Sequence, residues 1–358
     1  MTAVRTLLLG DSPAITGRVR RVLSSAAGVD VIGETTEPHQ ILSAVRALRP
    51  QVALVDLEPP GAVDAEILTA LLRETGLGVI ALLQLNDHTL PDLLTRGLAS
   101  GCLELIRPPV TGPGEAADRW DRALVDLVRL MVQGRGRAVS ARQPSPTPAP
   151  ARRRARLIGL AASTGGPAAV ARIVADLPAD LPVPLLLAQH MTPGFVASMI
   201  RWLAEITPLK VALAATGATP ERGTLYLAPD GHDIEMGDPS RLLVRPSNGP
   251  HSPSADRLFL SLADTLGAQA AGIVLTGMGK DGAAGLLALS RAGGTTLVQD
   301  EASSVVFGMP KAAIEIGAAG EVLAASAMAD AVRELAGWRA GATLALRLQP
   351  ASTDGDPR

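Results

Sequence analysis

Residues 156–167 read RLIGLAASTGGP, an apolar run that leads into a turn containing two glycines. The run predicts a buried strand, and Gly165, Gly166 and Pro167 predict a tight turn followed by the first turn of a helix. Ser163 therefore stands where the chain leaves the sheet, beside the unpaired N–H groups of a helix N-terminus. Two interpretations follow for this turn: a nucleophilic serine next to an oxyanion site, or a phosphate-binding loop.

The rest of the second half alternates between strand and helix patterns. Buried strands are expected at 157–162, 184–189, 271–276 and 295–299, and helices at 167–175, 193–206, 254–266, 283–292 and 327–338. This alternation predicts a doubly wound, mostly parallel α/β sheet with helices on both faces. Short strands predict an antiparallel meander at one edge, at 211–214, 224–228, 232–236 and 242–245.

The first 133 residues show the same alternation of strand and helix patterns. They therefore predict another parallel α/β domain, N-terminal to the one that contains residues 156–167. Strands are expected at 4–9, 29–34, 52–55, 79–83 and 103–106, and helices at 13–26, 38–48, 65–73, 90–98 and 115–132. Ligands of such sheets bind beyond the carboxyl ends of the strands. Asp11, Asp56 and Arg107 all fall there.

Composition supports two domains and excludes several classes of protein. The chain has 358 residues, of which 47% are hydrophobic, enough for a sizeable core in each domain. A net charge of -2 gives no case for a nucleic-acid partner. The single cysteine, Cys102, cannot form an internal disulfide and fits a reducing compartment. Because no apolar run is long enough to span a bilayer, we expect a cytoplasmic protein that is not inserted in a membrane.

A biased segment joins the two domains. Residues 134–156 contain seven arginines, four prolines and no acidic residue. Such a composition predicts a semi-extended, solvated linker. We therefore expect a regulatory domain at 1–133, a linker at 134–156, a catalytic domain at 157–340 and a weakly ordered tail at 341–358.

Three polar residues follow the ends of predicted strands in the second domain. Ser163, His190 and Asp281 should meet at one rim of a parallel sheet. A histidine can activate a serine by accepting its proton, and a carboxylate orients the histidine. Each residue also has an ordinary structural explanation, as a helix cap, a strand-end residue or a turn residue. The phosphate-loop alternative is weakened because neither G-x-G-x-x-G nor a Walker A pattern is present.

Longer strings carry a resemblance that chooses between these alternatives. The strings GLAASTGGP, QHMTPGF, LTGMGKDGA and QDEASSVVFGMP, at 159–167, 189–195, 275–283 and 299–310, are similar to those of the protein-glutamate methylesterases of bacterial chemotaxis. The resemblance implies that Ser163 is the nucleophile, His190 the base and Asp281 its orienting carboxylate. It also implies oxyanion donors and supporting groups among Thr164, Gly165, Gly166 and Met278, with Thr164 helping to fix His190.

The same resemblance implies a substrate. This would be a γ-glutamyl methyl ester on a methyl-accepting chemotaxis receptor, with glutamine deamidation at the same site and no cofactor for the esterase step. One departure is Ser252, where the family often has an arginine, and its neighbour His251 either lines the cleft or lies in an exposed loop. The competing hypothesis is a catalytically silent signalling or docking module.

The first domain resembles the receiver domains of response regulators, which share the flavodoxin-like fold. Asp56, in VDLEPP, matches the phosphate-accepting aspartate, and a histidine kinase is the implied phosphate donor. In that family Mg²⁺ is held by this aspartate and an acidic pair after the first strand. Here the pair reads Gly10-Asp11, so one carboxylate is missing.

Further receiver groups are also replaced. The family has a serine or threonine after the fourth strand, and this position corresponds to Leu83 or Gln84. The family's lysine before a proline is replaced here by Arg107. Losing a carboxylate weakens a Mg²⁺ site, and arginine does not reproduce lysine geometry. The resemblance therefore implies a degenerate receiver, poorly labelled at Asp56, that covers the catalytic crevice as a regulatory or docking domain.

Overall fold

The computed structural model describes residues 3–10, 12–57, 63, 65–74, 77–82, 103–106, 115–133, 152–191, 194–249 and 251–339. Several predictions lie outside these residues: those at Asp11, Leu83, Gln84, Cys102 and Arg107, the helix at 90–98, the linker up to residue 151 and the tail at 341–358.

The first domain is a parallel sheet in the order β2-β1-β3-β4-β5, formed by Val4–Leu9, Val29–Thr35, Val52–Asp56, Gly78–Leu82 and Leu103–Ile106 for β1 to β5. Its described helices are α1 (Pro13–Ser24), α2 (Pro38–Leu48), α3 (Ala65–Arg73) and α5 (Glu115–Gln133). Every residue of β3 and β4 is buried, as expected for parallel strands that are covered on both faces. This strand order is the flavodoxin-like order, so the predicted fold class is confirmed here.

The second domain is built on a seven-stranded sheet in the order β14-β13-β12-β6-β7-β9-β8. All its pairings are parallel. Its strands are β6 (Leu157–Ala162), β7 (Leu185–Gln189), β8 (Lys210–Leu213), β9 (Thr224–Leu227), β12 (Ala270–Val274), β13 (Thr295–Gln299) and β14 (Glu321–Leu323). The strand that carries the opening stretch, β6, lies in the middle of this sheet and is buried along its whole length.

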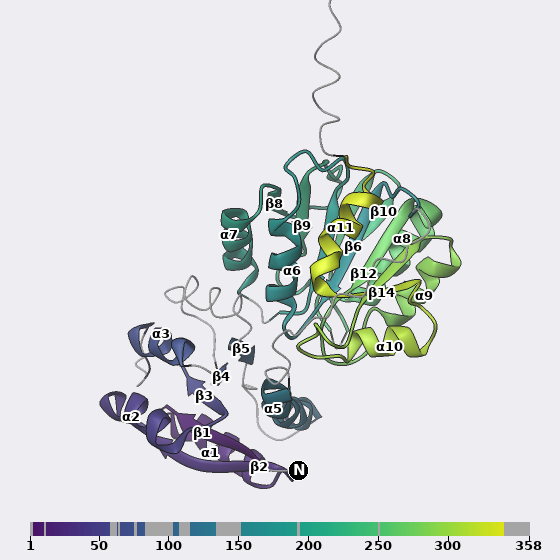
Figure 1. Ribbon diagram of the computed structural model, residues 1–358. Helices are drawn as coiled ribbons and strands as arrows, with labels where there is room; N and C mark the ends of the chain where they lie inside the picture. Colours follow the sequence, from purple (N-terminus) through teal and green to yellow (C-terminus); the bar gives the residue numbers. More distant parts are fainter. Residues whose placement is uncertain are drawn as a thin grey trace, which may run out of the picture.

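Helices cover both faces of this sheet (Figure 1). One core joins alternate residues of β6 to α6 (Gly166–Ala175), α7 (Val196–Ile206) and α11 (Ala325–Leu335). The other core joins the remaining β6 residues to α8 (Ala255–Thr265), α9 (Ala283–Arg291) and α10 (Met309–Glu315). None of the helices in the described part of the chain is long and apolar enough to cross a membrane.

The predicted edge meander is only partly antiparallel. Its last two strands, β10 (His232–Asp238) and β11 (Arg241–Pro246), form an antiparallel two-stranded sheet. Its first two, β8 and β9, instead join the main sheet in parallel, with β9 between β7 and β8. The sequence of β9 is TLYL, and all four residues are buried. A fully buried run is typical of an internal parallel strand, and this explains the difference.

Residues 152–156 pack against the second domain, although the sequence placed them in the linker. Arg152 pairs with Glu321 of β14 at 2.7 Å and also with Glu334 of α11. Ala155 is buried, and the Arg156 N–H donates to the Gln269 carbonyl at 2.6 Å. Composition alone missed these contacts because the acidic partners are far away in the sequence.

Candidate active site

Ser163 is the first residue after β6, in the turn that leads into α6. Its N–H donates to the Thr276 carbonyl at 3.0 Å, and its own carbonyl accepts from the Gly166 N–H at 2.7 Å. Gly165, directly before the helix, has a φ of 73°, and a Cβ there would lie 2.5 Å from Cβ of Val305. Glycine is therefore needed at this point for both its backbone conformation and its lack of a side chain.

His190 follows β7, the neighbour of β6, and is anchored beside Ser163. Its N–H donates to the carbonyl of Ala162, the last residue of β6, at 2.9 Å. The imidazole Nε2 lies 2.7 Å from Oδ2 of Asp281, and the side chain is only 12% exposed. The predicted histidine and carboxylate are thus in hydrogen-bonding contact.

Asp281 lies in the turn before α9, at the N-terminus of α8. Its carboxylate accepts hydrogen bonds from the Ala255 N–H at 2.7 Å, the Asp256 N–H at 3.0 Å and the Ser254 hydroxyl at 3.3 Å. Burial alone would raise the pKa of Asp281, but the hydrogen bonds from His190 and these N–H groups lower it to about 2. Asp281 is therefore an anion at neutral pH and can stabilise a protonated His190.

The strand order brings the three residues to one rim. Ser163 and His190 follow the adjacent strands β6 and β7, and Asp281 comes after β12, on the other side of β6. In the described part of the chain the Ser163 hydroxyl makes no hydrogen bond to His190. Such bonds are often long in enzymes without substrate, so the arrangement still suits acyl transfer.

Gln189 braces both the nucleophile and the base, a role that the sequence reasoning missed. Its side chain is 5% exposed, and Nε2 donates to the Ser163 carbonyl at 3.0 Å and to the His190 carbonyl at 2.9 Å. One amide nitrogen therefore links the backbones of the two residues. The available signal was a polar residue at the end of an otherwise apolar strand.

Thr276 supports the same turn from the other side. Its hydroxyl donates to the Thr164 carbonyl at 2.9 Å, and its N–H donates to Oε1 of Gln299 at 2.8 Å. The next residue, Gly277, allows a close approach, because a Cβ there would lie 2.8 Å from Cβ of Ser163. The turn around Ser163 is thus contacted by residues that follow β12, and Gln299 of β13 holds Thr276 in place.

Three of the predicted oxyanion donors, Gly166, Thr164 and Met278, divide into two groups. Gly166 donates its N–H to the Ser163 carbonyl, so it stabilises the turn and is not available as an oxyanion donor in this conformation. Within the described residues, the N–H groups of Thr164 and Met278 have no acceptor. None of the described contacts joins Thr164 to His190, so the expectation that Thr164 helps to fix the imidazole stays a prediction.

The loop before α8 adds a second histidine to the site. The rings of His251 and His190 are stacked, with centroids 4.9 Å apart and planes that differ by 7°. Of the two alternatives for His251, the structure therefore favours a position in the site over an exposed loop.

Comparison with known proteins identifies the family to which this architecture belongs. The family described as CheB methylesterase matches residues 158–332. A protein-glutamate methylesterase/protein-glutamine glutaminase 3 of Myxococcus xanthus is 37% identical over 334 residues, which is 92% of this chain and 93% of the relative. The chain belongs to the CheB methylesterase family. The family match contains Ser163, His190 and Asp281, so it covers the whole of the candidate site.

Other CheB methylesterases and solved structures are also similar. The protein-glutamate methylesterase/protein-glutamine glutaminase of Bordetella pertussis is 33% identical over 90% of this chain and 94% of its own length. The crystal structure of the Thermotoga maritima CheB methylesterase catalytic domain is 31% identical with a TM-score of 0.48, and covers 51% of this chain and 98% of that domain. The response regulator domain of Thermotoga maritima CheB is 18% identical with a TM-score of 0.31, and the match covers 37% of this chain and 97% of that domain.

The candidate phosphorylation site of this chain, Asp56, lies at the end of β3. Asp56 is 1% exposed, and Gly10, at the end of β1, has a φ of 150°. A Cβ on Gly10 would lie 2.3 Å from Cβ of Asp56, so the close approach of the two strands leaves no room for a carboxylate there. Within the described residues, no group of three or more His, Cys, Asp or Glu side chains could hold a metal ion. Asp11, the other predicted ligand, lies outside the described residues, so the Mg²⁺ site stays a prediction.

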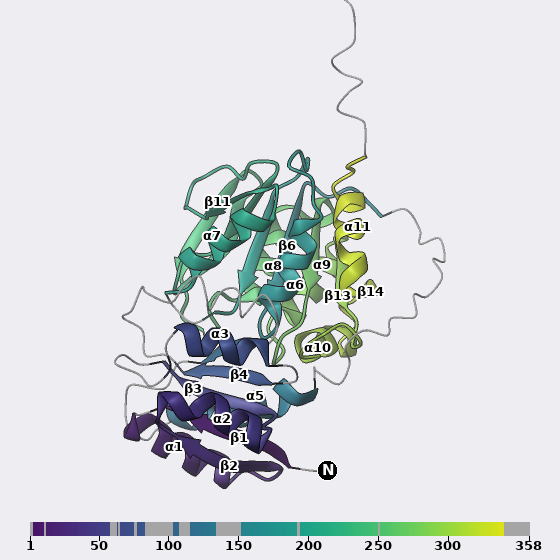
Figure 2. The same ribbon diagram turned by 60° about the vertical axis from the view of Figure 1, so that its left-hand side comes forward.

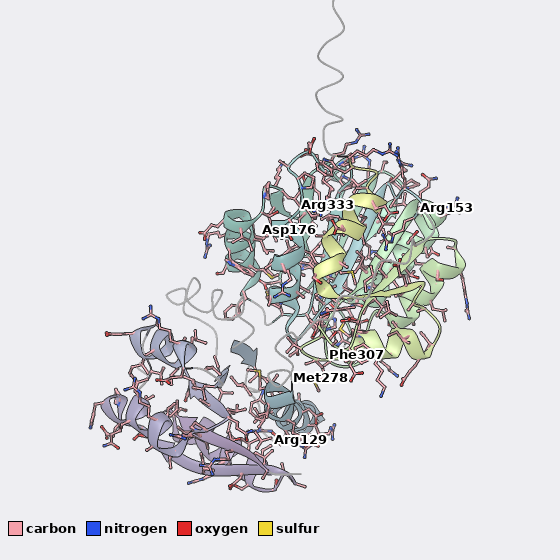
Figure 3. All side chains as sticks on the ribbon, in the orientation of Figure 1. Arg129, Arg153, Asp176, Met278, Phe307 and Arg333 are labelled. Carbon is pink, nitrogen blue, oxygen red and sulfur yellow. The ribbon has the colours of Figure 1, made fainter. Side chains whose placement is uncertain are left out.

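The first domain contacts the loop that follows His190. Phe195, directly before α7, is 5% exposed and belongs to an apolar cluster whose other buried members, such as Leu57 and Leu68, come from the first domain. Met191 packs against the same cluster. The first domain lies below the second in Figure 2, and Figure 3 shows Met278 and Phe307 at the end of the second domain nearest to it. The rim that carries the candidate site therefore faces the first domain.

Proposed function

We propose that this chain is a serine hydrolase that removes methyl groups from γ-glutamyl esters of methyl-accepting chemotaxis receptors. The single observation that carries the proposal is the His190–Asp281 contact of 2.7 Å beside the turn of Ser163. The names of the relatives support the same reaction and add glutamine deamidation. Ester and amide hydrolysis share an acyl-transfer path, so one site serves both reactions.

In the first step, the Ser163 hydroxyl oxygen attacks the ester carbonyl carbon. The Ser163 proton moves to Nδ1 of His190, the ring nitrogen that does not face Asp281. The resulting oxyanion accepts hydrogen bonds from the N–H groups of Met278 and Thr164, a type of interaction worth roughly 10²–10³ in rate for each donor. The bond between the carbonyl carbon and the methoxy oxygen then breaks, and His190 returns the proton to the departing methanol.

In the second step, water attacks the acyl-enzyme ester. His190 takes a proton from this water, the bond to the Ser163 oxygen breaks, and the serine recovers its proton from His190. The net reaction consumes one water and yields methanol, a glutamate carboxylate and a proton. With a glutamine side chain the same steps release ammonia. Asp281 stays ionised throughout and stabilises the imidazolium of His190 in both steps.

We further propose that the first domain regulates access to the site. Its apolar cluster holds Met191 and Phe195, next to the base, and a receptor helix must reach the same rim. Asp56 is the candidate phosphate acceptor, and a histidine kinase is the candidate donor. Because Gly10 adds no carboxylate beside Asp56, we expect poor labelling of Asp56 by acetyl phosphate with Mg²⁺. A cytoplasmic location follows from the proposed substrate.

A methanol-release assay on methylated receptor tests the proposed function. The full chain should release methanol, and Ser163→Ala should abolish release while the fold is retained. Ser240→Ala, at an exposed serine in the β10–β11 turn, serves as the matched control and should retain full activity. No methanol from any receptor of the same cell would favour the alternative of a silent docking module. Saturable nucleotide binding measured by calorimetry would favour a phosphate-binding turn instead.

A further inference from the structure

One side of the His190 ring is covered by a second histidine to which the proposed reaction gives no role. His251 lies between β11 and α8, and its ring is nearly parallel to that of His190, with centroids 4.9 Å apart. His251 is half-buried, so the contact is not a chance approach of two mobile surface rings. Stacking of this kind holds an aromatic ring in one plane.

The loop that carries His251 is itself held at both ends. The Ser247 hydroxyl donates to the His251 carbonyl at 3.0 Å, and the Ser254 N–H donates to Oδ1 of the buried Asp233 at 2.7 Å. The residues directly after this loop, Ser254 to Asp256, supply the hydrogen bonds to Asp281. A single segment, 251–256, therefore holds His190 in two ways: through Asp281 at its edge and through His251 on its face.

The surroundings of His251 favour its neutral form, chiefly because the ring is half-buried. Burial lowers the pKa of His251 below its usual value, and the positive charge that His190 can carry lowers it further. Asp281 and Asp256 oppose this by raising the pKa, but the net direction is downward. The groups that face His251 are thus His190 after β7, Asp281 before α9 and Asp256 on α8. At neutral pH His251 is uncharged, so it does not repel the imidazolium that forms on His190.

We propose that His251 is a positioning residue that fixes the plane of the His190 ring and shields one face of it from water. The role rests on the proposed function, since it concerns proton transfer between Ser163 and His190. With the ring fixed by Asp281 and His251, Nδ1 stays directed toward the serine. Excluding water from this face also keeps solvent from competing with Ser163 for Nδ1 of His190.

Two substitutions separate positioning from simple packing. In His251→Ala the ring loses its support and water reaches its face. We expect kcat to fall roughly tenfold with KM little changed, because alignment is impaired in a step that contributes roughly 10²–10⁴-fold. His251→Phe keeps a flat ring on the face of His190 and should retain kcat to within about twofold.

The experiment measures two rates on the full chain, with His232→Ala as the matched control at another histidine of the same domain. One rate is methanol release, and the other is covalent labelling of Ser163 by a fluorophosphonate probe, which needs no receptor. If labelling of Ser163 depends on His251 but no methanol is released, the proposed function is contradicted and this inference is supported. The inference is overturned if His251→Ala matches the parent in both rates, if His251→Phe loses as much as His251→Ala, or if the parent serine is not labelled.

Discussion

At the scale of single residues, the site depends on an anion that the fold keeps charged. Asp281 is 4% exposed, yet its carboxylate accepts hydrogen bonds from His190 and from the N-terminus of α8. A helix N-terminus stabilises negative charge through its free N–H groups and its dipole. The same contacts that orient His190 therefore also stabilise the folded protein.

Asp281 should give the protein an acid-sensitive part of its stability. Its pKa is lowered to about 2 in the fold, below the 3.8 of an ordinary aspartate. The folded state therefore gains stability that is present in full above the ordinary value and is lost as pH falls through about 2. We expect the unfolding free energy of the parent, minus that of Asp281→Asn, to shrink by roughly 2 kcal/mol between pH 5 and pH 2 in urea titrations. A difference that does not change with pH would contradict this expectation.

Gln189 should matter for turnover more than for substrate binding. Gln189→Met keeps the length of the side chain but removes both hydrogen bonds to the carbonyls of Ser163 and His190. We expect kcat to fall by about 10–100-fold with KM little changed, since small misplacements of catalytic groups are costly. Urea unfolding should show a loss of about 1–3 kcal/mol. Gln40→Met, at an exposed position of α2, should change neither quantity, and an unchanged kcat in Gln189→Met would exclude the bracing role.

At the scale of secondary-structure elements, the turns after β6 and β12 pack closely against each other. Gly277 follows the end of β12, and a Cβ on it would lie 2.8 Å from Cβ of Ser163 and 2.3 Å from Sδ of Met309 in α10. The methionine tail can move aside, but the Ser163 Cβ is attached directly to the backbone of the turn. Space between the two turns thus limits which residues can stand at position 277.

Gly277→Ala should displace the nucleophile. We expect a loss of at least about 100-fold in kcat, because a shift of about 1 Å in a catalytic group has effects of that size. Far-ultraviolet circular dichroism should show that the sheet is retained. Gly17→Ala in α1, where no atom lies within 4 Å of the added Cβ, should leave the activity unchanged and slightly stabilise its helix. Near-normal turnover of Gly277→Ala would mean that the turn has more freedom than these distances allow.

At the scale of the whole molecule, the two domains meet at the candidate site. Phe195 of the catalytic domain belongs to an apolar core of the first domain, and Met191 packs against that core. Both residues lie between His190 and α7. Contacts between domains are usually small enough for relative motion. The Phe195 contact therefore offers a place where movement of the first domain could change access to Ser163.

Phe195→Ala should weaken this contact and increase basal activity. The substitution removes a buried aromatic ring from the shared cluster, a change that typically costs about 3–5 kcal/mol when the cavity cannot close. We expect methanol release by the full chain to rise several-fold as the first domain releases the rim. Ile316→Ala, at a side chain that is 45% exposed, is the control for loss of an apolar side chain. Unchanged or lower turnover in Phe195→Ala would show that the first domain does not restrict the site.

Local pattern by itself determined most of the architecture and placed Ser163, His190 and Asp281 at strand ends, while longer strings assigned their roles by resemblance. Apolar periodicity and turn residues depend on neighbours in the chain, and the ends of parallel strands share one rim whatever their order. Only the tertiary structure decided how β8 and β9 pair, because parallel pairing joins residues that are distant in sequence. It also decided that Gln189 and Thr276 brace the turn, that Gly166 is used within it and that His251 lies on His190. These contacts are set by the packing of several elements against one another, and no local pattern encodes such distances.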